Sequence, residues 1–266
     1  MVGIFVLALL LTSGLAIVAS VNMLIKKRAN ARDSDRVSYV VTFPHAMEHD
    51  PLITWIRAIS RTTAGKGKNH RGAHSIAFEV EASHDGGIVH RMLIPWQIAD
   101  DITAQMRALI PGINVTRQPR RAIDAKAVAE VGLRDNGLPL HIPDASALST
   151  SILASLNPLT DGEAVNIQIV IVPAPREPLP TGGGPSHALW IELQQENPDV
   201  LRAKREKLSE PNFFAVVRVG AAANTKIRAQ HLVDRVRSSF RSTETPFNTW
   251  VKTRSGERVR IQNLRL

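Results

Sequence analysis

The sequence predicts an α+β fold in which one N-terminal transmembrane helix is followed by two tandem ferredoxin-like (βαββαβ) units. Three observations lead to this prediction. Residues 2–25 form an uncharged apolar stretch, short segments alternate apolar and polar residues, and the order strand, helix, strand, strand, helix, strand occurs twice. We expect residues 1–28 to form the anchor and its basic flank, residues 29–120 the first unit, and residues 121–266 the second.

The apolar stretch is long enough for a helix to cross the hydrocarbon core of a bilayer. Lys26, Lys27 and Arg28 follow it directly, and no basic residue precedes it. Because flanking basic residues stay on the cytoplasmic side, we expect a single-pass protein of the bacterial inner membrane with its N-terminus outside and its soluble region in the cytoplasm. A cleaved secretory signal is the alternative, but such a signal carries its basic residues before the apolar stretch.

The first unit follows from the spacing of its apolar residues. Residues 37–43 alternate as a strand does, and Asp50 and Pro51 are expected to cap and open a helix. The remaining predicted elements are a hairpin with strands at 76–81 and 88–94, a helix from about Gln97, and a short strand at 113–117.

The second unit repeats this order with one long insertion. We predict strands at 128–134, 165–171, 213–219 and 247–251, a helix capped by Asp144, and a basic helix at 225–241. Residues 173–211 interrupt the two central strands with a Pro- and Gly-rich run and a charged helix at 198–208. This insertion is either a spacer or a docking arm.

The charge of the chain is concentrated near its C-terminus. The net charge is +9, and from Arg202 onward 15 Lys and Arg residues stand against 5 Asp and Glu residues. We predict that these basic residues contact DNA phosphates or an acidic partner: Arg228, Arg235, Arg237, Arg241, Lys252, Arg254, Arg258 and Arg260. The alternative is a solvated basic face that aids solubility near anionic lipid.

The sequence gives no catalytic, cofactor-binding or metal site, so we expect that the chain is not an enzyme. The absence of Cys excludes disulfides and thiolate chemistry, and no Gly-rich segment has the Walker A pattern. His45, Glu48 and His49 have the H-x-x-E-H spacing of a zinc peptidase, but Pro44 and Pro51 argue against the helix which that site needs. A zinc hydrolase is the enzymatic alternative, and metal analysis with Glu48→Gln would test it.

Three of the four tryptophans are expected to pack rather than to stack on bases, and Trp190 is the exception. Trp55 belongs to an apolar stripe, Trp96 precedes a helix, and Trp250 lies in a predicted strand. For each of these three, packing in a core or an interface is the favoured interpretation over nucleic-acid stacking.

The chain resembles the N-terminal part of conjugative coupling proteins, which are type IV secretion DNA-transfer ATPases. The resemblance rests on the apolar anchor and on His74-Ser-Ile-Ala-Phe-Glu-Val-Glu-Ala82, Ala108-Leu-Ile-Pro-Gly-Ile-Asn-Val-Thr116 and Phe213-Phe-Ala-Val-Val-Arg-Val-Gly220. In that family this membrane-anchored region, which is not the ATPase, precedes a RecA-like motor that carries the Walker motifs. The sequence ends at Leu266, where such a motor would begin.

The resemblance implies a membrane-anchored, non-catalytic assembly and docking component of a DNA-transfer system that works with a separate ATPase. The partners it implies are the inner membrane, the secretion or conjugation ATPase or other subunits of the complex, and DNA bound without sequence specificity. We expect a homo-oligomer and no cofactor. A structural scaffold of a secretion or envelope complex that does not bind DNA is the alternative.

Overall fold

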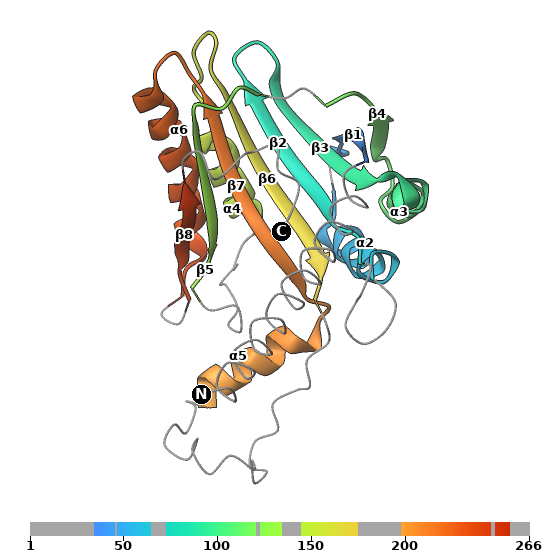
Figure 1. Cartoon of the computed structure of the whole chain (residues 1–266). Helices are drawn as coiled ribbons and strands as arrows, with labels where there is room; N and C mark the ends of the chain where they lie inside the picture. The colour runs from blue at the N-terminus through green and yellow to red at the C-terminus, as the bar shows by residue number, and fades with distance from the viewer. Residues whose placement is uncertain are drawn as a thin grey trace, which may run out of the picture.

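The computed structural model describes residues 35–45, 47–64, 73–120, 123–134, 145–174, 198–245 and 248–255. In these residues the chain forms eight strands and five α-helices, which Figure 1 shows. In chain order they are β1 (Arg36–Thr42), α2 (His49–Thr62), β2 (Ile76–Ser83), β3 (Gly87–Pro95), α3 (Trp96–Leu109), β4 (Asn114–Arg117), β5 (Ala127–Leu133), α4 (Ala145–Ser155), β6 (Ala164–Pro173), α5 (Pro198–Ser209), β7 (Phe213–Ala222), α6 (Lys226–Ser239), the 3₁₀ helix η1 (Phe240–Thr243) and β8 (Trp250–Ser255).

All eight strands belong to one antiparallel sheet with the order β4-β1-β3-β2-β6-β7-β5-β8. The two halves of the sheet meet where β2 pairs with β6 through eight residue pairs, from Ile76 opposite Ile171 to Ser83 opposite Ala164. The predicted fold class, two tandem units behind an anchor, was therefore wrong. The strands form one continuous sheet, because the pairing of β2 with β6 joins segments more than 80 residues apart, which no local pattern encodes.

The predicted membrane anchor, residues 2–25, lies outside the described residues. Within the described part of the chain, no helix is both long and apolar enough to cross a bilayer. We therefore withdraw the prediction of a single-pass inner-membrane protein with its N-terminus outside and the rest of the chain in the cytoplasm.

The elements themselves begin and end close to the predicted positions, with two informative differences. Helix α2 begins at His49, so Asp50 is not its cap but lies in its first turn, where a carboxylate favours the helix dipole. Strand β8 begins at Trp250 instead of residue 247. The predicted cap of α4, Asp144, lies outside the described residues, as do residues 175–197 of the predicted insertion.

The four helices α2, α3, α4 and α6 pack on the same face of the sheet. Ile76 belongs to the core beneath α2 and α3, whereas Ala82 belongs to the core beneath α4 and α6. Both residues lie on β2 and are separated by an even number of positions, so their side chains point to the same face. The opposite face, which these helices leave uncovered, is called the second face below.

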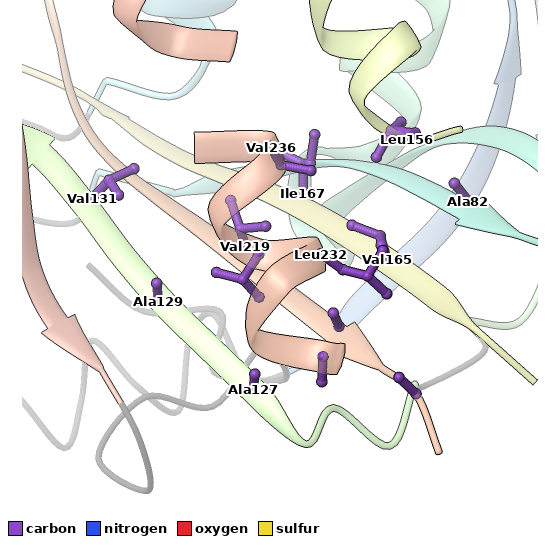
Figure 2. Packing of buried hydrophobic residues seen from close by; sticks show 14 of the residues in the cluster. Ala82, Ala127, Ala129, Val131, Leu156, Val165, Ile167, Val219, Leu232 and Val236 are labelled. Atoms are coloured by element: carbon purple, nitrogen blue, oxygen red, sulfur yellow. The ribbon is translucent and has the colours of Figure 1, made fainter. Parts of the chain in front are cut away.

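Helix α6 crosses its half of the sheet over small side chains. Leu232 and Val236 point from α6 toward Ile167, Val165 and Val219, as Figure 2 shows. From β5, the small side chains of Ala127 and Ala129 and the larger Val131 belong to the same core. The helix begins at its cap residue Thr225, whose hydroxyl accepts a hydrogen bond from the backbone N–H of Arg228 at 3.2 Å.

The second face carries a buried row of polar side chains that runs across five neighbouring strands. We call it the ionic row: Arg91 on β3, Glu79 on β2, Gln168 on β6, Arg218 on β7 and Glu130 on β5. Each member stands opposite the next in the strand register. Glu79, Gln168 and Arg218 are at most 3% exposed.

Gln168 joins the two halves of the ionic row. Its Nε2 donates to Glu79 Oε1 at 2.8 Å, and its Oε1 accepts a hydrogen bond from Arg218 Nη1 at 3.1 Å. Arg218 Nε also donates to Glu130 Oε2 at 3.1 Å. The amide therefore connects a carboxylate of the first half to a guanidinium of the second, directly across the central pair of strands.

Candidate anion-binding surface

The predicted basic residues of α6 separate into two groups in the structure. Arg228, in the first turn of α6, and Arg235, in its second half, contact the segment between α4 and β6 through Glu163 and Pro158. Arg237, near the end of α6, and Arg241, in the following η1, line a pocket of about 150 Å³. The predicted surface is therefore not a single row of free cations along α6.

Arg228 is paired with a buried carboxylate. Its Nε and Nη2 donate to the two oxygens of Glu163 at 2.7 and 3.1 Å, while the backbone N–H of Thr160 donates to the same carboxylate at 2.9 Å. The side chain of Glu163 is 4% exposed. The hydrogen bonds from Arg228 lower the pKa of Glu163 to about 2, although burial acts in the opposite direction.

This pairing predicts a specific acid sensitivity. Because the pKa of Glu163 lies below its ordinary value of 4.5, the pair contributes its full stability above that value and loses it as the pH falls toward about 2. We expect Glu163→Gln to lower the free energy of unfolding by about 1–2 kcal/mol at neutral pH. The difference between variant and wild type should shrink below about pH 4, as measured by urea unfolding across that range. A difference that does not change with pH would contradict this assignment.

Arg235 is held by a backbone carbonyl. Its Nη1 and Nη2 both lie 3.3 Å from the oxygen of Pro158. Burial, together with the positive charge of Arg228, lowers the pKa of Arg235 from its ordinary value. Arg228 and Arg235 thus tie α6 to the segment before β6.

The cations near the end of α6 form the candidate site. We call Arg237, Arg241 and Lys252 the C-terminal cluster; the last of these lies on the neighbouring strand β8. Arg237 donates to Asp234 at 2.8 Å, whereas Arg241 and Lys252 are exposed. Trp250 and Glu244 line the same pocket as Arg237 and Arg241.

Asp234 stays ionised beside the C-terminal cluster. Burial raises its pKa, but hydrogen bonds from Gln230 and Arg237 and the positive charge of Lys252 together lower the pKa below its ordinary value. The carboxylate offsets part of the positive charge of Arg237. Arg241 and Lys252 are therefore the members of the cluster that are best placed to meet an anionic partner.

The remaining predicted contacts lie on β8 or beyond it. Arg254 stands opposite Glu130 in the register of β8 with β5. Arg258 and Arg260 lie outside the described residues.

The structure also brings together cations that the sequence analysis did not combine. Arg36, Arg117 and Arg120 line one pocket at the opposite edge of the sheet. In the sequence they belong to a basic flank and to a basic connector that are about 80 residues apart, and the pairing of β1 with β4 unites them. The run Arg117-Gln-Pro-Arg-Arg is the local signal that could have indicated this site.

The predicted zinc-peptidase spacing does not lie on one helix. Glu48 has extended backbone angles, φ −75° and ψ 152°, and α2 begins only at His49. Among the residues that the structure describes, no group of three His, Cys, Asp or Glu side chains is arranged to hold a metal ion.

No family model and no curated protein matches the chain. Among solved structures it is similar to 6-hydroxy-D-nicotine oxidase from Arthrobacter nicotinovorans, at 10% identity and a TM-score of 0.35, over 78% of this chain and 43% of that one. It is also similar to a chitooligosaccharide oxidase, at 10% identity and a TM-score of 0.37, over 82% of this chain and 46% of that one. The chain spans less than half the length of either oxidase.

Both structures are oxidases, and we withdraw the prediction that the chain is not an enzyme. TM-scores this low carry no argument for an oxidase activity of this chain. Neither structure is a secretion or conjugation protein.

Proposed function

We propose that this protein is an assembly and docking component that binds an anionic partner, with DNA as that partner, in a DNA-transfer system that includes a separate ATPase. The observation that carries the proposal is the exposure of Arg241 and Lys252 beside the pocket at the end of α6. The sequence resemblance to coupling proteins supports the wider setting. The ATPase and the expected homo-oligomer belong to the same proposal.

The contacts would be with phosphates and not with base edges. Guanidinium and ammonium groups bind phosphate oxygens through charge and hydrogen bonds, and such contacts carry no sequence information. Neutralising a few phosphates releases counterions, so the affinity should fall steeply as salt concentration rises. The basic excess of the C-terminal third would add a long-range attraction for the same partner.

The test is the binding of labelled duplex and single-stranded DNA to the full chain, measured by fluorescence anisotropy at low and raised salt. We expect Arg241→Glu with Lys252→Glu to lower the affinity about tenfold or more and to flatten the salt dependence, because two phosphate contacts are lost.

The matched control is Arg61→Glu with Arg202→Glu, which makes the same change in net charge at exposed positions on α2 and α5. An equal loss in both double variants would mean that only the overall charge matters. No binding by the wild type at low salt would remove DNA as the partner.

One observation favours the alternative of a scaffold that does not bind DNA. Arg228, Arg235 and Arg237 are engaged with Glu163, Pro158 and Asp234, so these cations already stabilise the fold. The oligomeric state of the full chain in detergent, compared with and without DNA, separates the two functions. Assembly that is complete without DNA, together with the absence of DNA binding, supports the scaffold.

A further inference from the structure

Strand β7 is longer than the strand that pairs with it on one side. Strand β6 pairs with all ten residues of β7, whereas β5 pairs only with residues 217–221. Beyond Val131, β5 pairs with β8 instead, and a shift of register between Glu130 and Val131 marks the place where it turns. Within the described part of the chain, no strand pairs with this side of residues 213–216, which we call the free edge of β7.

Two residues of the free edge direct their backbone groups away from β6. The N–H of Ala174 donates to the oxygen of Asn212 at 2.9 Å. The next pair in the register, Pro173 with Phe213, is therefore a non-bonded pair, because the two kinds of pair alternate in an antiparallel ladder. Phe213 and Ala215 accordingly direct their N–H and C=O groups toward the side that β5 has left. These groups can pair with a further strand.

The free edge of β7 has none of the features that usually block an exposed strand. Prolines and charged side chains are the common blocks. On β6, which is the other strand of the same ribbon, Pro173 lies beyond the last residue paired with β2 and has no N–H to donate. The free edge of β7 reads Phe-Phe-Ala-Val, and Phe214 is 53% exposed. An unblocked apolar edge of this kind is a template for a strand from another chain.

The charges near the free edge favour a partner that carries acidic residues. Arg134 directly follows β5, is exposed, and makes no side-chain hydrogen bond or ion pair with another of the described residues. Glu210 is the acidic residue nearest in sequence to the free edge, and Arg57 already donates to its two oxygens at 2.6 and 2.9 Å. From Arg202 onward the chain has an excess of Lys and Arg over Asp and Glu. A segment with both acidic and apolar residues complements these charges and Phe214.

We propose that the free edge of β7 binds an extended acidic and apolar segment of another protein by β-augmentation. Phe213 and Ala215 supply the main-chain hydrogen bonds. Phe214 packs on an apolar side chain of the segment, and Arg134 pairs with a carboxylate. The segment lies beside β7 in line with β5, not at the outer strands of the sheet. The inference goes beyond the proposed function, because it gives the docking role a protein partner and does not depend on DNA.

The experiment measures the binding of labelled synthetic peptides to the full chain by fluorescence anisotropy. The first probe is a peptide of about eight residues in which Val and Glu alternate. Two further probes carry N-methyl groups on the amides of one or the other alternating set of residues. We expect methylation of one set to abolish binding and methylation of the other to leave it unchanged, because only every second residue of a strand directs its N–H to a given neighbour. A Val–Lys peptide should bind about tenfold more weakly than the Val–Glu peptide.

Variants of the chain test the same contacts from the other side. Phe214→Ala should weaken binding of the Val–Glu peptide about tenfold, because an apolar contact is lost. Ala215→Pro should abolish it, whereas Ala215→Val, which keeps the N–H, should not. Arg134→Glu should weaken binding of the Val–Glu peptide and not that of the Val–Lys peptide. The methylated peptides test the pairing on the unaltered chain, so the result does not depend on whether Ala215→Pro folds.

The controls lie elsewhere on the surface. Trp96→Ala removes another aromatic side chain, which is 58% exposed at the start of α3, contrary to the prediction of packing. Arg61→Glu makes the same charge change at an exposed position of α2. Neither control should alter the affinity for the Val–Glu peptide by more than about twofold.

Three results would overturn the inference. They are no binding of the Val–Glu peptide by the wild type, equal binding of both methylated peptides, and a dimer of the chain that Ala215→Pro dissociates, since the free edge would then pair with a second copy. Binding of labelled DNA, measured on the same samples, keeps the two proposals apart. If DNA binds and the peptide does not, the proposed function stands and this site does not; if only the peptide binds, this site stands without DNA as the partner.

Discussion

Replacing Arg218 with Met is expected to lower the free energy of unfolding by about 3–5 kcal/mol. Arg218 is 3% exposed and donates to both Glu130 and Gln168 in the ionic row. Methionine has a similar length but no charge, so a buried carboxylate would lose its cation and a buried amide would lose its donor. Urea unfolding of the full chain, followed by circular dichroism, measures the loss.

Two further variants show whether the loss arises from the ion pair. Arg218→Met combined with Glu130→Leu should recover much of the stability, because the carboxylate left without its cation is also removed. Arg202→Met, at an exposed position of α5, should change stability by less than about 0.5 kcal/mol. A single Arg218→Met variant as stable as the wild type would contradict the assigned role of the ionic row.

Leu232→Ala is expected to cost about 2–5 kcal/mol and to destabilise both halves of the sheet. Leu232 is 1% exposed in the core beneath α6, where truncation leaves a cavity between the helix and the sheet. Because β2 and β6 are paired along their length, unfolding of the second half removes the hydrogen-bonded neighbour of the first. Backbone amide exchange followed by mass spectrometry should therefore accelerate in β3 and β1 as well as in β5 and β7.

The control for this prediction lies on the same helix. Ile227 is 79% exposed, so Ile227→Ala should change stability by less than about 0.5 kcal/mol. Faster exchange confined to the second half in Leu232→Ala would mean that the halves unfold independently, as two tandem units would.

The strands and helices could be predicted because each has a local period. Ile76, Phe78 and Val80 alternate with Ala77, Glu79 and Glu81, and the structure places a strand there. The joining of the two halves could not be predicted, because β2 pairs with β6 through contacts distant in sequence. The same pairing explains why Glu79, which alternation alone would place on a solvated face, is 2% exposed and hydrogen-bonded to Gln168.

The candidate site could be predicted only in part, because some of its contacts also join residues that are distant in sequence. The helical period places the arginines of residues 225–241 outward, and Arg241, which lies in η1, is indeed exposed. The period does not reveal that Glu163 lies beside Arg228 or that Pro158 lies beside Arg235, because both partners belong to a segment about 65–77 residues away. The pocket of Arg36, Arg117 and Arg120 likewise depends on how β1 and β4 are paired.

The strand order also limits how another chain could extend this sheet. Since β2 and β6 lie at the centre, the outermost of the described strands are β4 and β8. Strand β4 has four residues and is followed closely by Pro119, which has no N–H to donate, so it is a poor template for a further strand. Strand β8 has six residues. A strand from another chain that extends this sheet by β-augmentation would therefore pair with β8, the strand that carries Lys252, and not with β4.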